Sequence, residues 1–323
     1  MVSDKKLQSY SFDISIFGWQ CIRFLDKAAI MVQDSSERNT DAQGSEKPNP
    51  WMVCPVTQVE ETKLILRMVP IWFFSLIFAM TALQSNSLFV KQGSTMDRSI
   101  GSHFRIPSAS LMALQTICAI VFVIIYDRCI VALARRITGN ERGITVFQRI
   151  GIGMLFSVLS MVTTSLTENM RIRVAKTHGL LDSPKATIPL SVFWLTPQLL
   201  LMGMADVFAI VGLQEYFYDQ VPDNMRSLGI AFYLSVLGVA SFLGSFLVTI
   251  VERVTKRRGH EGWLGNDLNR SKLGYYYWLL AILSVINLSC YVCLTRVYTY
   301  KKVEQITSDM ADSSEAVQHC QGV

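Results

Sequence analysis

Charged residues are scarce in this chain of 323 residues, of which 17% are Asp, Glu, Lys or Arg. A soluble globular protein carries about 25%, whereas half of the residues here are hydrophobic. The apolar residues also come in long blocks, which a soluble core does not require. We therefore interpret the chain as a membrane protein. Most basic residues fall between the blocks, and no clustered basic and aromatic face predicts a nucleic-acid partner.

Histidine and cysteine are missing from the patterns that would indicate several kinds of chemistry. None of the four histidines lies in an apolar block, which argues against an intramembrane proton relay or metal site. The seven cysteines show neither zinc spacing nor a disulfide framework, and Cys290 and Cys293 lie inside an apolar block without a nearby histidine. Because the blocks also lack an evident pair of nucleophile and base, we expect neither enzyme activity nor a cofactor.

Six apolar blocks predict an all-α, polytopic membrane protein, because a membrane helix needs roughly 20 apolar residues. Residues 1–62 are largely polar and are expected to form a cytosolic arm, followed by a membrane half at 63–300 and a polar cytosolic tail at 301–323. Basic residues flank both sides of the membrane, and of the two orientations we favour cytosolic termini. The predicted spans lie at about 64–84, 107–126, 150–165, 188–213, 228–251 and 275–295, and the third is expected to continue as helix beyond both of its ends.

The stretch Ile188–Gln220 carries the most informative polar pattern. Asp206 is the only acid inside any of the predicted spans. An ionised carboxylate within a membrane helix costs about 2.5 kcal/mol or more, so Asp206 is expected to face water, a partner charge or another helix. Trp194, Gln198 and Met202 precede it at four-residue spacing, and each step turns only about 40° around the axis. The four residues therefore form one stripe, typical of the lining of a solute pathway.

Other interpretations of this region stay open. Asp206 could instead make a polar bond that fixes helix packing, and Glu215 is nearer the interface and is expected to be structural. Pro197 and Gly203 are expected to open the helix, where the backbone bends or is approached closely. After the second span, Asp127 and Arg128 could latch neighbouring helices through charge-assisted bonds, or could be ordinary interfacial charge.

A series of short motifs extends over roughly residues 23 to 302. They are RFLDKAAI at 23–30, NPW at 49–51, VTQVEETK at 56–63, FVKQG at 89–93, MDR at 96–98, YDR at 126–128, QRIG at 148–151, FW at 193–194, PQ at 197–198, GLQEYFYDQ at 212–220 and MRS at 225–227. Jointly they resemble plant nitrate/peptide transporters, the proton-dependent oligopeptide transporter branch of the major facilitator superfamily.

This resemblance implies a fold of two six-helix halves with a site at the midplane between them. It covers only the second half, and the family's acidic first-span motif, which is linked to proton coupling, has no counterpart here. The resemblance also implies cytosolic termini. It matches Asp127 and Arg128 to a cytosolic gating motif, and it places Asp206 in the span where peptide-carrying relatives have a substrate-facing acid.

The predicted function is therefore proton-coupled symport of a small solute, such as nitrate, a peptide or a plant metabolite, in the plasma or vacuolar membrane. The solute would be faced by Gln84, Asn86, Trp194, Gln198 and Asp206. Besides the lipid bilayer, we expect a missing N-terminal half or a full-length relative as partner, and little transport by this chain alone. Two alternatives stay open: a non-transporting membrane protein that modulates full-length relatives, and a truncated gene model.

Overall fold

The computed structural model describes residues 56–100, 104–126, 128, 136, 144–182, 186–219, 221, 226–256, 262–265, 268–269 and 271–296. The chain divides into two compact units, one of Met1–Pro70 with Val297–Val323 and one of Ile71–Arg296. Of the first unit only residues 56–70 are described, and they form the first part of a helix. Most of the predicted arm and the whole predicted tail therefore lie outside the described residues.

The described part of the chain consists mainly of apolar helices. Within it, five helices are long and apolar enough to cross a membrane, and one apolar helix is shorter. The six are α3 (Val56–Ser94), α4 (Ser110–Ile125), α6 (Val146–Thr177), α7 (Thr196–Asp219), α8 (Arg226–Lys256) and the helix Leu273–Arg296. Only α4, with 16 residues, is shorter than the roughly 20 residues that a crossing needs. The prediction of an all-α, polytopic fold is confirmed for these residues.

Helix α6 continues beyond both ends of the predicted third span, as expected from the sequence. Its N-terminus is fixed by a capping box, in which the Thr145 hydroxyl accepts from the Gln148 N–H and the Gln148 side chain accepts from the Thr145 N–H. Its other end is reached only at Thr177, so Glu168 and Arg171 lie inside a helix of membrane-spanning length. Asp206 is therefore the only acid in the predicted spans but not in the longer helices that the structure describes.

Helix α7 begins later than the sequence predicts. Ile188–Ser191 forms strand β4, which pairs in parallel with β1 (Met96–Asp97), and a 3-10 turn, η3 (Val192–Leu195), leads into α7. The expected opening of the helix at Pro197 is wrong. Pro197 lies in the first turn of α7, where its missing N–H removes no bond within the helix.

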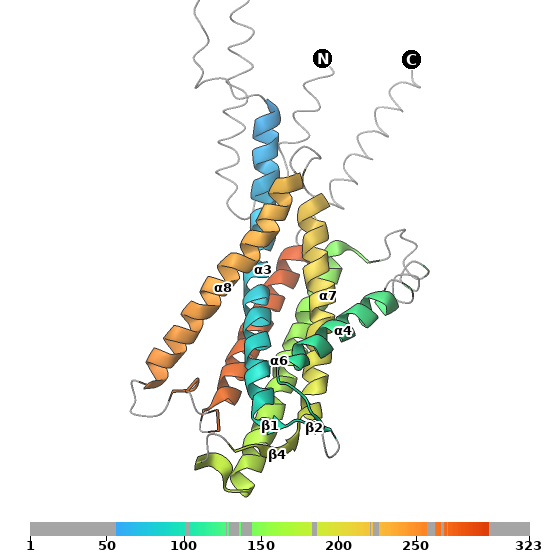
Figure 1. The fold of residues 1–323 in the computed structure, drawn as a ribbon. Helices are drawn as coiled ribbons and strands as arrows, with labels where there is room; N and C mark the ends of the chain where they lie inside the picture. Colours follow the sequence, from blue (N-terminus) through green and yellow to red (C-terminus); the bar gives the residue numbers. More distant parts are fainter. Residues whose placement is uncertain are drawn as a thin grey trace, which may run out of the picture. The chain divides into compact units, whose positions relative to one another are not determined.

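The short strands gather at one end of the helices, which we call the strand end (Figure 1). Besides β1 and β4, the antiparallel pair β2 (Ser99–Ile100) and β3 (Phe104–Arg105) lies there. The Ser99 hydroxyl and N–H both donate to Asp97 Oδ1, at 2.5 and 3.1 Å, and these bonds hold the pKa of Asp97 below its usual range. The connections at the strand end are thus held by local polar bonds.

Helices α6 and α7 lie side by side along their lengths (Figure 1). Their close approach depends on Gly153, because a Cβ there would lie 2.5 Å from the backbone nitrogen of Ala209. Nearby, the rings of Phe156 and Phe208 stack with centroids 5.7 Å apart. The pair α6–α7 therefore packs backbone against backbone at its middle.

A buried ion pair stands near the strand end of α6. Glu168 and Arg171 are both 0% exposed, and the Arg171 Nε and Nη2 donate to the two carboxylate oxygens at 2.8 and 2.6 Å. The remaining donors of Arg171 reach Thr95 Oγ1 at 3.1 Å, Asn269 Oδ1 at 3.0 Å and the Leu268 carbonyl at 2.9 Å. All five N–H groups that a guanidinium carries are thus bonded.

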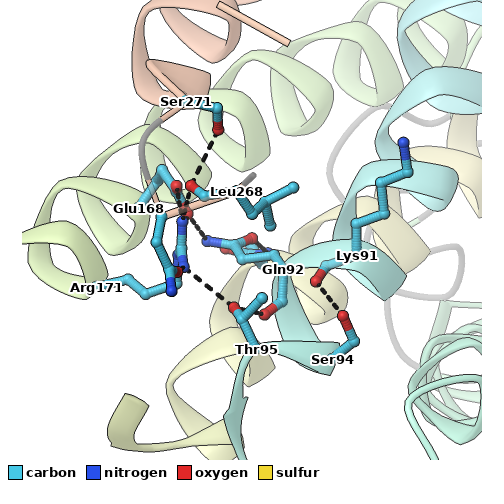
Figure 2. A network of polar contacts seen from close by, with 10 residues as sticks. Lys91, Gln92, Ser94, Thr95, Glu168, Arg171, Leu268 and Ser271 are labelled. Atoms are coloured by element: carbon cyan, nitrogen blue, oxygen red, sulfur yellow. Dashed lines mark hydrogen bonds and ion pairs between the residues drawn. The ribbon is translucent and has the colours of Figure 1, made fainter. Parts of the chain in front are cut away.

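This ion pair is connected to two further helices through amides. Gln92 of α3 donates to Glu168 Oε2 at 2.9 Å, and Gln198 of α7 donates to Gln92 Oε1 at 3.2 Å. Figure 2 shows Gln92 pointing toward Glu168 and Thr95 toward Arg171. The network therefore joins α3, α6, α7 and the segment before the helix Leu273–Arg296.

Gly153→Ala should lower the unfolding free energy of the full chain by about 1–3 kcal/mol, because the added methyl group overpacks the contact between α6 and α7. Gly238→Ala in α8 is the matched control, since nothing lies within 4 Å of a Cβ at that position. Thermal unfolding in detergent measures both variants. Equal unfolding temperatures of Gly153→Ala and Gly238→Ala would contradict the close packing described at Gly153.

Arg171→Leu should destabilise the chain by about 3–5 kcal/mol, because Glu168 would keep a buried charge without its partner. The double variant Glu168→Leu/Arg171→Leu removes both charges and should unfold at a higher temperature than Arg171→Leu alone. Thermal unfolding in detergent compares the two variants. A double variant that unfolds at a lower temperature than Arg171→Leu would contradict the view that the unpaired charge of Glu168 causes the loss of stability.

Candidate functional site

The carboxylate of Asp206 lies between α7 and α4. Its Oδ2 accepts from Gln115 Nε2 of α4 at 3.0 Å, and the Asp206 side chain is mostly buried. The helices meet closely beside this pair, because a Cβ at Gly203 would lie 3.1 Å from the Gln115 carbonyl oxygen. Asp206 therefore faces another helix, one of the three environments expected from the sequence.

The pair is not saturated with hydrogen bonds. Asp206 Oδ1 and Gln115 Oε1 are both buried, and neither has a hydrogen-bond partner among the described residues. Gln115 itself is only 6% exposed. Two buried acceptors beside one another leave this site able to bind a proton, an ammonium group or another donor.

Two other members of the predicted stripe lie in different surroundings. Trp194 is on the η3 turn and is 50% exposed, whereas Gln198 is fully buried. The Gln198 side chain donates to Gln92, and the Gln198 backbone carbonyl accepts from Ser160 Oγ at 3.0 Å. The structure thus places Gln198 in the buried network near the strand end and Trp194 at the surface.

The predicted residues of α3 lie elsewhere again. The Tyr276 hydroxyl donates to Gln84 Oε1, and a Cβ at Gly244 of α8 would lie 2.7 Å from Gln84 Nε2. Asn86 is partly buried, and its Oδ1 has no hydrogen-bond partner among the described residues. Within this part of the chain, no hydrogen bond joins any two of the five predicted solute-facing residues.

The predicted gating pair cannot be placed as a pair. Asp127 lies outside the described residues, and Arg128 is described and exposed. Next to this segment, the guanidinium of Arg149 lies over the Tyr126 ring, with Arg149 Cζ 4.8 Å from the ring centroid. Arg149 also pairs with Glu215 of α7 at 2.9 Å. This ion pair agrees with the structural role expected for Glu215.

A groove of about 470 Å³ lies between α7 and α8, at the end of α7 opposite the strand end. It is lined by Gln214, Glu215, Tyr218, Asp219, Gly229, Ile230, Tyr233 and Leu234. Gln214 and Tyr233 border it from α7 and α8 respectively. Asp206 is not among the lining residues and lies about two helical turns before Gln214 on α7.

The arrangement is suited to binding polar groups rather than to metal chemistry. In the part of the chain that the structure describes, no group of three or more His, Cys, Asp or Glu side chains could hold a metal ion. Sequence reasoning missed Gln115, although it is an amide in the middle of an apolar block. Asking which polar residue could pair with Asp206 would have drawn attention to it.

The chain matches the POT family over residues 24–264. Among curated relatives, Arabidopsis thaliana Protein NRT1/PTR FAMILY 5.7 is 49% identical over 302 residues, which are 93% of this chain and 49% of the relative. Protein NRT1/PTR FAMILY 5.4 of the same plant is 44% identical over 288 residues, or 89% of this chain and 50% of the relative. The chain thus spans about half the length of these relatives.

Two solved structures have a similar fold. One is the crystal structure of an auto-inhibited POT family peptide transporter, with a TM-score of 0.56 and 19% identity over 75% of this chain and 42% of that one. The other is the POT family transporter PepTSo, with a TM-score of 0.58 and 16% identity over 93% of this chain and 53% of that one. The helices described above therefore have a fold similar to about half of each of these two structures.

These findings agree with the resemblance that the sequence motifs carry and with the apolar helices of a multi-pass membrane protein. The chain belongs to the POT family, which consists of membrane transporters and not of enzymes.

Proposed function

We propose that this chain forms one wall of a proton-coupled pathway for a small solute and that Asp206 lies on that wall. The observation that carries the proposal is the incompletely bonded Asp206–Gln115 pair inside membrane helices. An intramembrane acid is costly, so one that keeps a free acceptor is typical of a proton or substrate contact. Gln84, Asn86 and Trp194 remain proposed contributors to the same wall.

The groove between α7 and α8 supports a proposal for the side of the membrane from which the solute enters. It is bordered by polar and aromatic side chains, including Gln214 and Tyr233, and Gln214 lies about two helical turns beyond Asp206 on α7. If the termini are cytosolic, as proposed from the family resemblance, the groove opens on the cytosolic side and the strand end faces away from the cytosol. Nitrate, peptides and plant metabolites are the candidate solutes, in the plasma or vacuolar membrane.

A second candidate function is that of a non-transporting protein that binds and modulates full-length relatives. The exposed apolar face of α8 favours it, since Phe242 and Phe246 are 80% and 65% exposed. Large apolar side chains on one face suit contact with lipid or with another membrane helix. Co-purification of the tagged chain with a full-length relative would support this function, and recovery without any such relative would count against it.

Oocytes expressing this chain alone should take up little nitrate or dipeptide, because one wall leaves the pathway without its opposite face. Co-expression with the first six helices of an NRT1/PTR relative should restore uptake that is stronger in acidic than in neutral medium. Surface labelling checks that both proteins reach the membrane. Strong acid-stimulated uptake by the chain alone would refute the one-wall proposal.

Asp206→Asn should reduce the restored uptake roughly tenfold to hundredfold, because a charge-assisted contact contributes about 1.5–3 kcal/mol. The stimulation by acid should weaken as well, since asparagine cannot take up a proton, while the acidic motif of the co-expressed first six helices remains. Glu252→Gln is the control, because Glu252 is a partly exposed acid near the end of α8, away from the groove and from Asp206. Normal uptake and acid stimulation in Asp206→Asn would exclude Asp206 from the pathway.

A further inference from the structure

We propose that the hydrogen bond between Gln92 and Gln198 is a positioning contact that sets the rotation of α7 and so holds Asp206 against α4. Gln198 then acts through the helix and does not touch solute, which revises the solute-facing role predicted from the sequence. The importance of Asp206 for transport rests on the proposed function. The positioning itself is a property of the fold and can be measured without solute.

The first step is that α7 is held firmly at its beginning. Gln198 is 0% exposed and its side chain donates to Gln92 Oε1, while its backbone carbonyl accepts from the Ser160 hydroxyl of α6. Gln92 is equally buried and is held in turn by Glu168. The start of α7 is therefore fixed from two neighbouring helices, α3 and α6, and indirectly by the fully bonded ion pair.

The second step is that rotation at Gln198 determines the direction of Asp206. Eight residues of α-helix separate them, which amounts to about 12 Å along the axis and about 80° around it. Gln198 points toward α3, and Asp206, on a different side of α7, meets Gln115 of α4. Because α7 is one continuous helix from Thr196 to Asp219, both directions turn together.

The third step is that the contact with α4 tolerates little rotation. The backbone of α4 approaches α7 at Gly203, where a Cβ would lie only 3.1 Å from the Gln115 carbonyl oxygen. Turning α7 would move the glycine away from this contact and bring a side chain in its place. It would also separate the Asp206 carboxylate from its donor. The amide bridge near the strand end therefore keeps the acid and its partner aligned.

The test is chemical cross-linking in the full chain. Cysteines replace Gln115 and Asp206 in a background in which the native cysteines are changed to alanine, and a short bifunctional thiol reagent joins them. Gln198→Leu should slow cross-linking roughly threefold to tenfold, because the loss of one buried hydrogen bond changes a population by a factor of that order. Gln92→Leu should have the same effect, and combining the two should add little.

Asn287→Leu is the matched control for a purely structural effect. Asn287 is a buried amide that donates to the Phe74 carbonyl at 3.0 Å, so its loss also removes a buried contact to α3 but leaves α7 untouched. It should lower the thermal stability without slowing the cross-link. Equal slowing in Asn287→Leu and Gln198→Leu would overturn the proposal, because general loosening would then explain both.

A Gln198→Leu chain that keeps its helical circular dichroism and cross-links at the parent rate would also refute positioning. If Gln198→Leu does not fold, Gln198→Asn decides, since it keeps a buried amide but shortens the side chain by one methylene and so withdraws it from Gln92 Oε1. Slower cross-linking in Gln198→Asn would support the proposal, and an unchanged rate would overturn it. Because the cross-link needs no solute, a failure of Asp206→Asn to affect transport leaves this result standing.

Discussion

The buried Glu168–Arg171 pair is the interaction on which the arrangement of the described helices depends. Removing two charges from water is expensive, and their attraction compensates only when every remaining donor and acceptor is bonded. Here the guanidinium donates five hydrogen bonds to four residues, and both carboxylate oxygens of Glu168 accept hydrogen bonds. Those partners come from α3, from α6 itself and from the segment before the last described helix. Satisfying one ion pair thus brings these segments to a common point.

The two acids Glu168 and Asp206 both lie in membrane-type helices, yet their bonding differs. Both carboxylate oxygens of Glu168 accept hydrogen bonds, three in all, and its charge is paired with Arg171. Asp206 has one described donor, Gln115, and an oxygen without a described partner. In a medium of low polarity an unbonded acceptor is costly, and it persists where binding or protonation uses it. This contrast separates the structural acid from the candidate functional one.

The fold and the family could be predicted from the sequence because they depend on features that are local along the chain. Apolar blocks of sufficient length predict membrane helices, and the short motifs carry the family resemblance without any knowledge of contacts. The exact end of α6 could not be predicted, because the hydrophobic block ends near 165 but the helix runs to Thr177. Glu168 and Arg171 lie beyond the predicted span because hydropathy penalises charges that tertiary contacts neutralise.

The sequence by itself determined that the chain is helical, membrane-embedded and related to POT transporters, and it identified Asp206 as an acid with an unusual position. Only the tertiary structure decided which polar residues meet. Gln198 and Asp206 share a stripe on an ideal helix, yet one contacts α3 and the other α4. Spacing fixes where side chains stand around one axis, whereas their partners depend on which neighbouring helices approach that axis and at what height.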